Sequence, residues 1–336
     1  MLKKAINKLY INHMNHSFLY IIIIMYTHLF IISILFIIVV SYQPDPPTIA
    51  ILSFPNPTNT AEPANKSSIW EGYIRWIEQT GMKIVAIHPW YSHEQIDEVL
   101  NNVNGILFIG GNRTVDINQH FEQVGRYIID KVIEMNKEKD YFPLFGICFG
   151  YELLLAHIAN DNSIIKADFE AKKIFLPSEL NDKSAMSRLF SYFRQRDFDD
   201  ISKTPSTYQL HTRGITPEDF ERFNTTKEFF DVTSYATDKK GTKFINSIEG
   251  KNFPIYGIQY HPEVVPYARS EGFIGEHSRE AIRISQLHGV FFLSEAARSH
   301  HRMDKDLKTK FEFVNSYEKP EKDSYRKGYY TFAKKD

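Results

Sequence analysis

Short apolar runs alternate with helical patterns through the first half of the chain. Runs typical of buried strands lie at residues 48–54, 83–88, 105–109 and 142–147. Between the last two runs, apolar residues recur at three- and four-residue steps, which is typical of an amphipathic helix. That helical face carries Ile117, Phe121, Val124, Ile128, Val132 and Met135. This alternation predicts an α/β fold in which a mostly parallel sheet is sandwiched by helices.

The other apolar patterns predict further elements of the same kind. Between the first two strands, we expect a helix that begins at Ser68, a favourable cap, and ends at Gly81. Its apolar face is formed by Ile69, Tyr73, Trp76 and Ile77. Strand-like runs return at residues 231–235, 243–248 and 254–260, and a last helix carries Ala281, Ile284, Leu287 and Phe291. The charged tail after residue 300 holds several aromatic residues, so we expect it to pack back onto the domain.

The N-terminus has a composition of its own. Residues 18–40 contain no Asp, Glu, Lys or Arg, three lysines precede them, and prolines from Pro44 onward end any helix. The run is long enough to span a bilayer as a retained signal anchor. It also fits a cleaved signal peptide, because Val39 and Ser41 are small enough for signal peptidase. The cleaved signal peptide is the favoured interpretation.

Both interpretations place the rest of the chain in the lumen of the secretory pathway or beyond it. Three glycosylation acceptors of the Asn-x-Ser/Thr type fit that location: Asn65, Asn112 and Asn224. We therefore divide the chain into a signal peptide or anchor (residues 1–41), a main domain (42–317) and a charged, aromatic-containing tail (318–336). A membrane would be contacted only through an uncleaved N-terminal segment.

The composition argues against several classes of protein. A formal net charge of −1 does not suggest a nucleic-acid partner. A single cysteine excludes an internal disulfide framework and a cysteine-rich zinc site. The 13 histidines form no His-Glu-x-x-His pattern, so we expect neither a metal nor another cofactor. The sequence leaves open whether the protein is a monomer or a homodimer.

The one cysteine, Cys148, stands between Gly146 and Gly150, where a predicted strand runs into a helical pattern. A tight strand-to-helix turn of this kind presents a side chain, and the helix N-terminus beneath it favours the thiolate, which is the nucleophile. Most free cysteines are only small buried hydrophobes. Ordinary packing, however, needs no glycine on both sides. We therefore consider Cys148 a candidate nucleophile.

A cysteine nucleophile needs a base, and the base needs an orienting group. His261 ends the last strand-like run, and Glu263, two residues on, can accept its imidazole N–H. A surface histidine and glutamate after an edge strand would be the commoner case. An oxyanion also needs backbone N–H donors, which Gly110, Gly111 and Phe149 can supply, although Gly-Gly after a strand is otherwise an ordinary turn.

These segments resemble the catalytic segments of class I glutamine amidotransferase-like hydrolases, and more closely those of gamma-glutamyl hydrolases, also called folylpolyglutamate hydrolases. The likeness extends from about residue 48 to residue 317. Its marks lie at residues 104–111, 140–143, 145–150, 247–250, 254–257, 259–263 and 266–267. The resemblance implies a flavodoxin-like, class I amidotransferase architecture. It also implies a cysteine peptidase in which Cys148 is the nucleophile, His261 the general base and acid, and Glu263 its orienting group.

The resemblance further implies an enzyme of the lysosome or vacuole, or a secreted one, and it implies a substrate and its ligands. It predicts hydrolysis of the gamma-glutamyl amide bonds of folate poly-gamma-glutamates, a small-molecule substrate, through a thioester intermediate. His211 falls where the family has a second active-site histidine, although a core or surface histidine is nearly as good an interpretation. Because the substrate tail carries several α-carboxylates, Arg113 and Arg213 are candidate substrate ligands.

Two departures from the wider superfamily matter. Gly150-Tyr151-Glu152 replaces the Gly-His-Gln or Gly-Gln-Gln of ordinary glutamine amidotransferases, which argues against free glutamine as the substrate. Residues 112–116 make a longer loop than is usual, and a glycan on Asn112 would crowd the cleft. We therefore expect that Asn112 is unmodified or that its loop turns away. Hydrolysis of other gamma-glutamyl compounds, such as glutathione conjugates, and a catalytically idle membrane-associated protein remain the alternatives.

Overall fold

The computed structural model describes residues 25–28, 45–56, 64–267, 277–304, 310–316 and 328–334. The chain divides into two compact units, Met1–Asp45 and Pro46–Asp336. Of the first unit, residues 25–28 are helical, and the rest of the predicted leader lies outside the described residues. No helix in the described ranges is long and apolar enough to cross a membrane.

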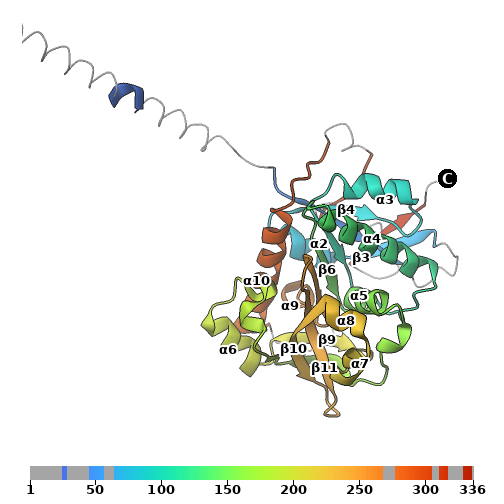
Figure 1. The fold of residues 1–336 in the computed structure, drawn as a ribbon, viewed down its shortest axis with the longest axis vertical. Coiled ribbons are helices and arrows are strands. Elements are labelled where there is room, and N and C mark those ends of the chain that lie inside the picture. Colours follow the sequence, from blue (N-terminus) through green and yellow to red (C-terminus); the bar gives the residue numbers. More distant parts are fainter. Residues whose placement is uncertain are drawn as a thin grey trace, which may run out of the picture. The chain divides into compact units, whose positions relative to one another are not determined.

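In the described part of the second unit, nine strands form one sheet in the order β13-β4-β1-β5-β6-β12-β11-β10-β8 (Figure 1). The five central strands are parallel: β4 (Lys83–Ile87), β1 (Thr48–Leu52), β5 (Ile106–Phe108), β6 (Leu144–Ile147) and β12 (Ile255–Ile258). Each outer strand pairs antiparallel with its inner neighbour. These strands are β11 (Lys243–Gly250), β10 (Phe230–Thr237) and β8 (Glu179–Leu180) on one side, and β13 (Phe313–Val314) on the other. The predicted mostly parallel sheet is confirmed.

Helices cover both faces of this sheet, and alternate residues of each strand point to opposite faces. In β1, Ala50 and Leu52 belong to the core beneath α3 (His93–Leu100), α4 (His120–Lys137) and α5 (Phe149–Ala159). Ile49 and Ile51 belong to the second core, beneath α2 (Glu71–Glu78) and α10 (Arg279–Ala296). Such double burial explains why these strands are continuously apolar in sequence.

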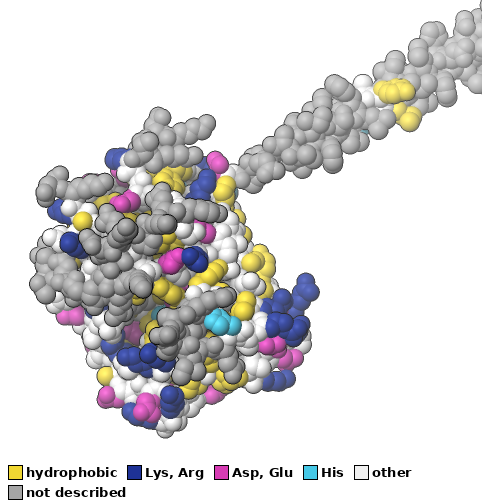
Figure 2. Space-filling view, turned by 180° about the vertical axis from the view of Figure 1, so that it is seen from behind, with side chains coloured by type: hydrophobic (Ala, Val, Ile, Leu, Met, Phe, Trp, Pro, Cys, Tyr) yellow, Lys and Arg dark blue, Asp and Glu magenta, His cyan; other side chains and the backbone are white. Residues whose placement is uncertain are grey.

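Smaller elements surround the sheet. Strands β14 (Tyr329–Ala333), β3 (Lys66–Trp70) and β2 (Phe54–Pro55) form a three-stranded sheet, and β7 (Ala171–Leu176) pairs with β9 (Thr207–His211). The short helices are α6 (Gln195–Lys203), α7 (Pro217–Arg222), α8 (Asn224–Phe229) and α9 (Val264–Tyr267). Charged side chains of both signs are scattered over the face seen in Figure 2.

The C-terminal segment packs back onto the domain as expected. Strand β13 extends the main sheet beside β4, and β14 pairs with β3 along its whole length. This pairing also corrects the predicted start of the first helix. Ser68 lies in β3 opposite Thr331, and α2 begins only after Trp70. A strand partner about 260 residues away in the chain overrides the local capping signal of Ser68.

Other helix boundaries also differ from expectation. Helix α2 is followed by Gly81 with a φ of 87°, as the predicted end requires. Helix α4 begins at His120 rather than at Ile117, whose backbone N–H donates to the side chain of Asn162. Helix α3 has no counterpart among the predicted elements, although Ser92 and Gln95 form a capping box at its start.

Candidate active site

Cys148 lies at the turn between β6 and α5, with a φ of 52° and a ψ of −107°. A positive φ is uncommon for a residue with a side chain, and it costs about 1–3 kcal/mol unless the surroundings impose it. The neighbouring glycines allow the turn. A β-carbon at position 150 would lie 2.4 Å from the carbonyl oxygen of Phe108, and one at position 146 would lie 2.8 Å from the carbonyl carbon of Gly150. The tight turn predicted from the two glycines is therefore present.

His261 reaches the same point from the neighbouring strand. Strand β12 pairs with β6, and the Cys148 N–H donates to the carbonyl of Ile258 at 2.8 Å. His261 Nδ1 lies 2.7 Å from an oxygen of Glu263, and both side chains are buried. His261 Nε2, the other ring nitrogen, is buried and has no nitrogen or oxygen partner among the described residues.

The charges around His261 favour its protonated form. Burial by itself lowers the pKa of His261, but the charges of Glu263 and Cys148 outweigh burial and hold that pKa well above its ordinary value. An imidazolium flanked by a carboxylate and a thiolate can give a proton to a leaving group. The structure therefore brings together the three residues that the sequence predicted to act as one unit: Cys148, His261 and Glu263.

Tyr73 joins this group, which the sequence did not predict. Its hydroxyl accepts the N–H of Gly110 at 2.8 Å and lies 3.5 Å from Nδ1 of His261. Burial, followed by the charge of Glu263, raises the pKa of Tyr73 well above its ordinary value, so the phenol keeps its proton. That proton can be donated to Glu263. The sequence pattern places Tyr73 only on the apolar face of a helix. Its hydroxyl, which needs a hydrogen-bond partner when buried, is the one sequence signal of a further role.

The hydrogen bond to Tyr73 corrects the role predicted for Gly110. Its N–H is already engaged, so of the three predicted oxyanion donors only Gly111 and Phe149 remain. Gly110 matters instead because it leaves room. A β-carbon there would lie 2.8 Å from Cε1 of His261 and 3.2 Å from the β-carbon of Cys148. Phe149 is the first residue of α5, where backbone N–H groups lack an acceptor within the helix.

A buried polar group lies one helical turn beyond Cys148. The Glu152 N–H donates to the Cys148 carbonyl, and one Glu152 oxygen accepts from the Gln259 side chain at 3.2 Å. Arg213 Nε lies 3.8 Å from the other oxygen, Oε2. Within the described ranges, that Oε2 atom, Arg213 Nε and Gln259 Oε1 are buried and make no hydrogen bond. Such atoms are expected where a polar ligand binds.

Glu152 and His211, two ionisable side chains of this buried region, have shifted pKa values. Burial raises the pKa of Glu152 to about 7, although Arg213 offsets part of the effect. Burial lowers the pKa of His211 to about 3, so His211 is neutral at physiological pH. Its Nδ1 lies 2.6 Å from the carbonyl oxygen of Arg213, and its Nε2 lies 3.1 Å from the side-chain oxygen of Gln209. His211 thus borders the site as a neutral, buried residue.

Arg113 does not belong to this group. Its guanidinium makes two hydrogen bonds, of 2.8 and 3.1 Å, to the buried carboxylate of Glu122. Its carbonyl accepts a hydrogen bond from Arg213 at 2.6 Å. This ion pair removes Arg113 from the predicted substrate ligands, whereas Arg213 remains. In the described part of the chain, no group of three or more His, Cys, Asp or Glu residues is arranged to hold a metal ion.

Cys148 lies at a tight strand-to-helix turn, beside the His261–Glu263 pair at the carboxyl edge of the sheet. This arrangement is typical of a cysteine-dependent amidotransferase-type site. The family model for class-I glutamine amidotransferases matches residues 64–277. The chain therefore belongs to the class-I glutamine amidotransferase family.

Among curated proteins, the chain is similar to gamma-glutamyl hydrolases. It is 29% identical to gamma-glutamyl hydrolase B of Dictyostelium discoideum, over 77% of this chain and 74% of that protein. It is 27% identical to the gamma-glutamyl hydrolase of Homo sapiens, over 68% and 71%. A solved glutamine amidotransferase of Thermotoga maritima aligns with a TM-score of 0.42 at 10% identity, over 76% of this chain and 99% of that one. The predicted resemblance to gamma-glutamyl hydrolases is confirmed.

Replacing Tyr73 by phenylalanine tests its positioning role. We expect kcat for a gamma-glutamyl amide to fall roughly 10- to 100-fold with little change in KM, because Gly110 and Glu263 lose a shared partner. Tyr127→Phe is the matched control, since its hydroxyl bonds Asp97 away from the site. Equal kcat values for the two variants, measured on folded proteins, would refute the role.

Glu152→Gln tests the buried carboxyl through stability. The pKa of Glu152 is higher in the folded protein than in the unfolded one, so protonated Glu152 stabilises the fold. This contribution to the free energy of unfolding is fully present below the pKa of the unfolded state and is lost as the pH rises through about 7. The loss amounts to at most about 3 kcal/mol. In urea unfolding we expect Glu152→Gln to be more stable than the parent above neutral pH and nearly equal to it in acid. The exposed Glu218→Gln serves as control, and a pH-independent difference would contradict this assignment.

Proposed function

We propose that this chain hydrolyses the gamma-glutamyl amide bonds of folate poly-gamma-glutamates. The observation that carries the proposal is the strained Cys148 turn beside the buried His261–Glu263 pair. The curated relatives that match 77% and 68% of this chain are gamma-glutamyl hydrolases, which supports the same bond as the substrate.

In the first half of the reaction, the Cys148 thiolate attacks the gamma-carbonyl carbon and a carbon–sulfur bond forms. The carbonyl oxygen becomes an oxyanion that the N–H groups of Gly111 and Phe149 can bind. His261, as imidazolium, gives its proton to the amide nitrogen as the carbon–nitrogen bond breaks. The amine leaves, and the gamma-glutamyl group stays on Cys148 as a thioester.

In the second half, water replaces the amine. His261 is now neutral and takes a proton from a water molecule, whose oxygen attacks the thioester carbon. The carbon–sulfur bond breaks, the carboxylic acid product forms, and Cys148 leaves as the thiolate. Throughout both steps, Glu263 holds Nδ1 of His261, which fixes the ring and stabilises its positive charge.

The charged residues Arg213 and Glu152 help to decide which gamma-glutamyl compound is the substrate. Each glutamyl unit of a poly-gamma-glutamyl tail has a free α-carboxylate, whereas its amine is already part of an amide bond. Arg213 suits such a carboxylate. Since burial raises the pKa of Glu152 to about 7, Glu152 is largely neutral in an acidic compartment and does not compete for Arg213 there.

A second candidate substrate follows from Glu152 itself. When ionised, its buried Oε2 atom, which lacks a hydrogen-bond donor among the described residues, could bind the free α-ammonium group of a compound such as a glutathione conjugate. The catalytically idle alternative is disfavoured by the intact geometry of Cys148, His261 and Glu263.

The leader and the glycosylation acceptors support a location in the secretory pathway, in a lysosome or vacuole or outside the cell, with the signal peptide cleaved. Asn65, Asn112 and Asn224 are exposed, as glycan attachment requires. A soluble, glycosylated enzyme that acts as a monomer or homodimer is consistent with this proposal, and membrane attachment would need the leader to be retained.

The decisive experiment compares Cys148→Ala with the parent on methotrexate polyglutamates and on a glutathione conjugate. We expect Cys148→Ala to lose at least about 1000-fold in kcat, because no other nucleophile replaces the thiolate. His261→Asn should lose activity as well, whereas His93→Asn, an exposed control, should keep it. Because Cys148 is the only cysteine, a trapped acyl-enzyme must carry its added mass there. Full activity of Cys148→Ala on both substrates would overturn the mechanism.

N-terminal sequencing of the protein purified from its natural location tests the leader. A mature N-terminus close to residue 42 and recovery in the soluble fraction are the expected result. An intact leader with recovery in membranes would show that the segment is retained as an anchor. Glycopeptide mapping of the same sample reports occupancy at Asn65, Asn112 and Asn224, and full occupancy at Asn112 would count against a cleft beside its loop.

A further inference from the structure

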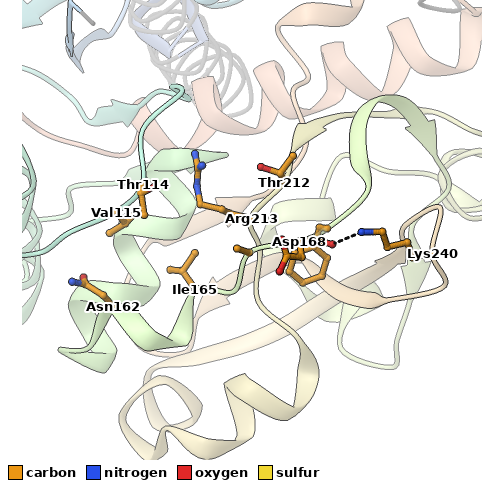
Figure 3. Close-up of a pocket in the computed structure, with 10 residues that line it drawn as sticks. Thr114, Val115, Asn162, Ile165, Asp168, Thr212, Arg213 and Lys240 are labelled. Atoms are coloured by element: carbon orange, nitrogen blue, oxygen red, sulfur yellow. Dashed lines mark hydrogen bonds between the residues drawn. The ribbon is translucent and has the colours of Figure 1, made fainter.

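A cavity of about 470 Å³ adjoins the buried polar group of Glu152, Gln259 and Arg213 (Figure 3). Four segments line it: the loop after β5, the segment after α5, the end of β9 and the turn between β10 and β11. Its polar lining includes Arg213, Lys240, Asp168 and Thr212. Arg213 belongs to both places, since it lines this cavity and its Nε lies 3.8 Å from Glu152.

The charged groups of the cavity favour an anion. Lys240 Nζ lies 3.2 Å from the backbone carbonyl of Asp168, and Lys240 forms no ion pair with any described residue. The lining contains two cationic residues, Arg213 and Lys240, and one acidic residue, Asp168. The turn that carries Lys240 is itself fixed, because Asp238 accepts the N–H groups of Lys240 and Thr242.

The rest of the lining is mixed: Thr114 and Asn162 are polar and uncharged, and four residues are apolar. The apolar part consists of Val115, Ile165, Ala167 and Phe169. Such walls with a few placed polar groups are typical of small-molecule sites of this size. A gamma-glutamyl tail has the matching chemistry, because each unit has one carboxylate and a two-carbon apolar stem.

We propose that this cavity binds the gamma-glutamyl tail beyond the scissile bond region, with one α-carboxylate at Arg213 and another at Lys240. The inference rests on the proposed function and adds a subsite that makes the enzyme prefer long tails. Because α5 joins Cys148 to Glu152, and Glu152 lies against Arg213, a carboxylate held at Arg213 lies next to the helix that carries the nucleophile.

Lys240→Gln tests the subsite, with Lys239→Gln as the matched control. Both lysines are exposed in the same turn, but only Lys240 lines the cavity. The measured quantity is the ratio of kcat/KM for a pentaglutamate substrate to kcat/KM for a diglutamate substrate. We expect Lys240→Gln to lower this ratio about threefold to tenfold, through KM for the long substrate, and Lys239→Gln to leave it unchanged. An equal effect of both variants would overturn the subsite.

A binding measurement separates this inference from the proposed function. Free tetra-gamma-glutamate, which lacks folate, is titrated into Cys148→Ala and into its double variants with Lys240→Gln or Lys239→Gln. Binding that weakens at least about threefold only with Lys240→Gln supports the subsite, whether or not the parent turns over a polyglutamate. Turnover by the parent with no dependence of binding on Lys240 leaves the proposed function standing and refutes the subsite. Absent turnover together with absent binding refutes both.

Discussion

The backbone of Cys148 is the constraint on which the site depends. A non-glycine residue with positive φ persists only where its surroundings impose the conformation, and here β6, α5 and the carbonyl of Phe108 do so. The strand holds one side of the turn through parallel pairing, and α5 packs too closely on β5 for a side chain at position 150. The cost of about 1–3 kcal/mol is offset by the packing of these elements and leaves the sulfur at the sheet's edge.

Charge compensation is the second condition, because His261 and Glu263 are buried together. A buried carboxylate needs a partner, and Nδ1 of His261 and the phenol of Tyr73 surround that of Glu263. Tyr73 in turn accepts the N–H of Gly110, so a residue from α2 ties the loop after β5 to the catalytic pair. Removing any one member would leave a buried polar group of another member without its partner.

Sequence reasoning predicted the central sheet, its two helical layers and the grouping of Cys148, His261 and Glu263, because each depends on local signals. Apolar runs identify strands buried on both faces, and Gly146 and Gly150 identify the turn. What it missed depends on contacts between distant segments. The strand around Ser68 forms only because Tyr329–Ala333 pairs with it, and the Arg113–Glu122 ion pair and the Tyr73–Gly110 bond appear only in the folded chain. Local patterns hold no information on such partners.

Glu152, which stands where ordinary glutamine amidotransferases have glutamine, connects the Cys148 turn to the buried polar group. The same helical turn that presents Cys148 also places Glu152 in the interior, where Gln259 from the segment after β12 and Arg213 from the segment after β9 meet it. A carboxyl in that position is largely uncharged in an acidic compartment and ionised in an alkaline one, since burial raises its pKa to about 7. Under the proposed function, Arg213 would therefore be free to hold a substrate carboxylate mainly when Glu152 is protonated. One buried side chain would then link the acidity of the surroundings to the binding of an acidic substrate, with no change in Cys148, His261 or Glu263.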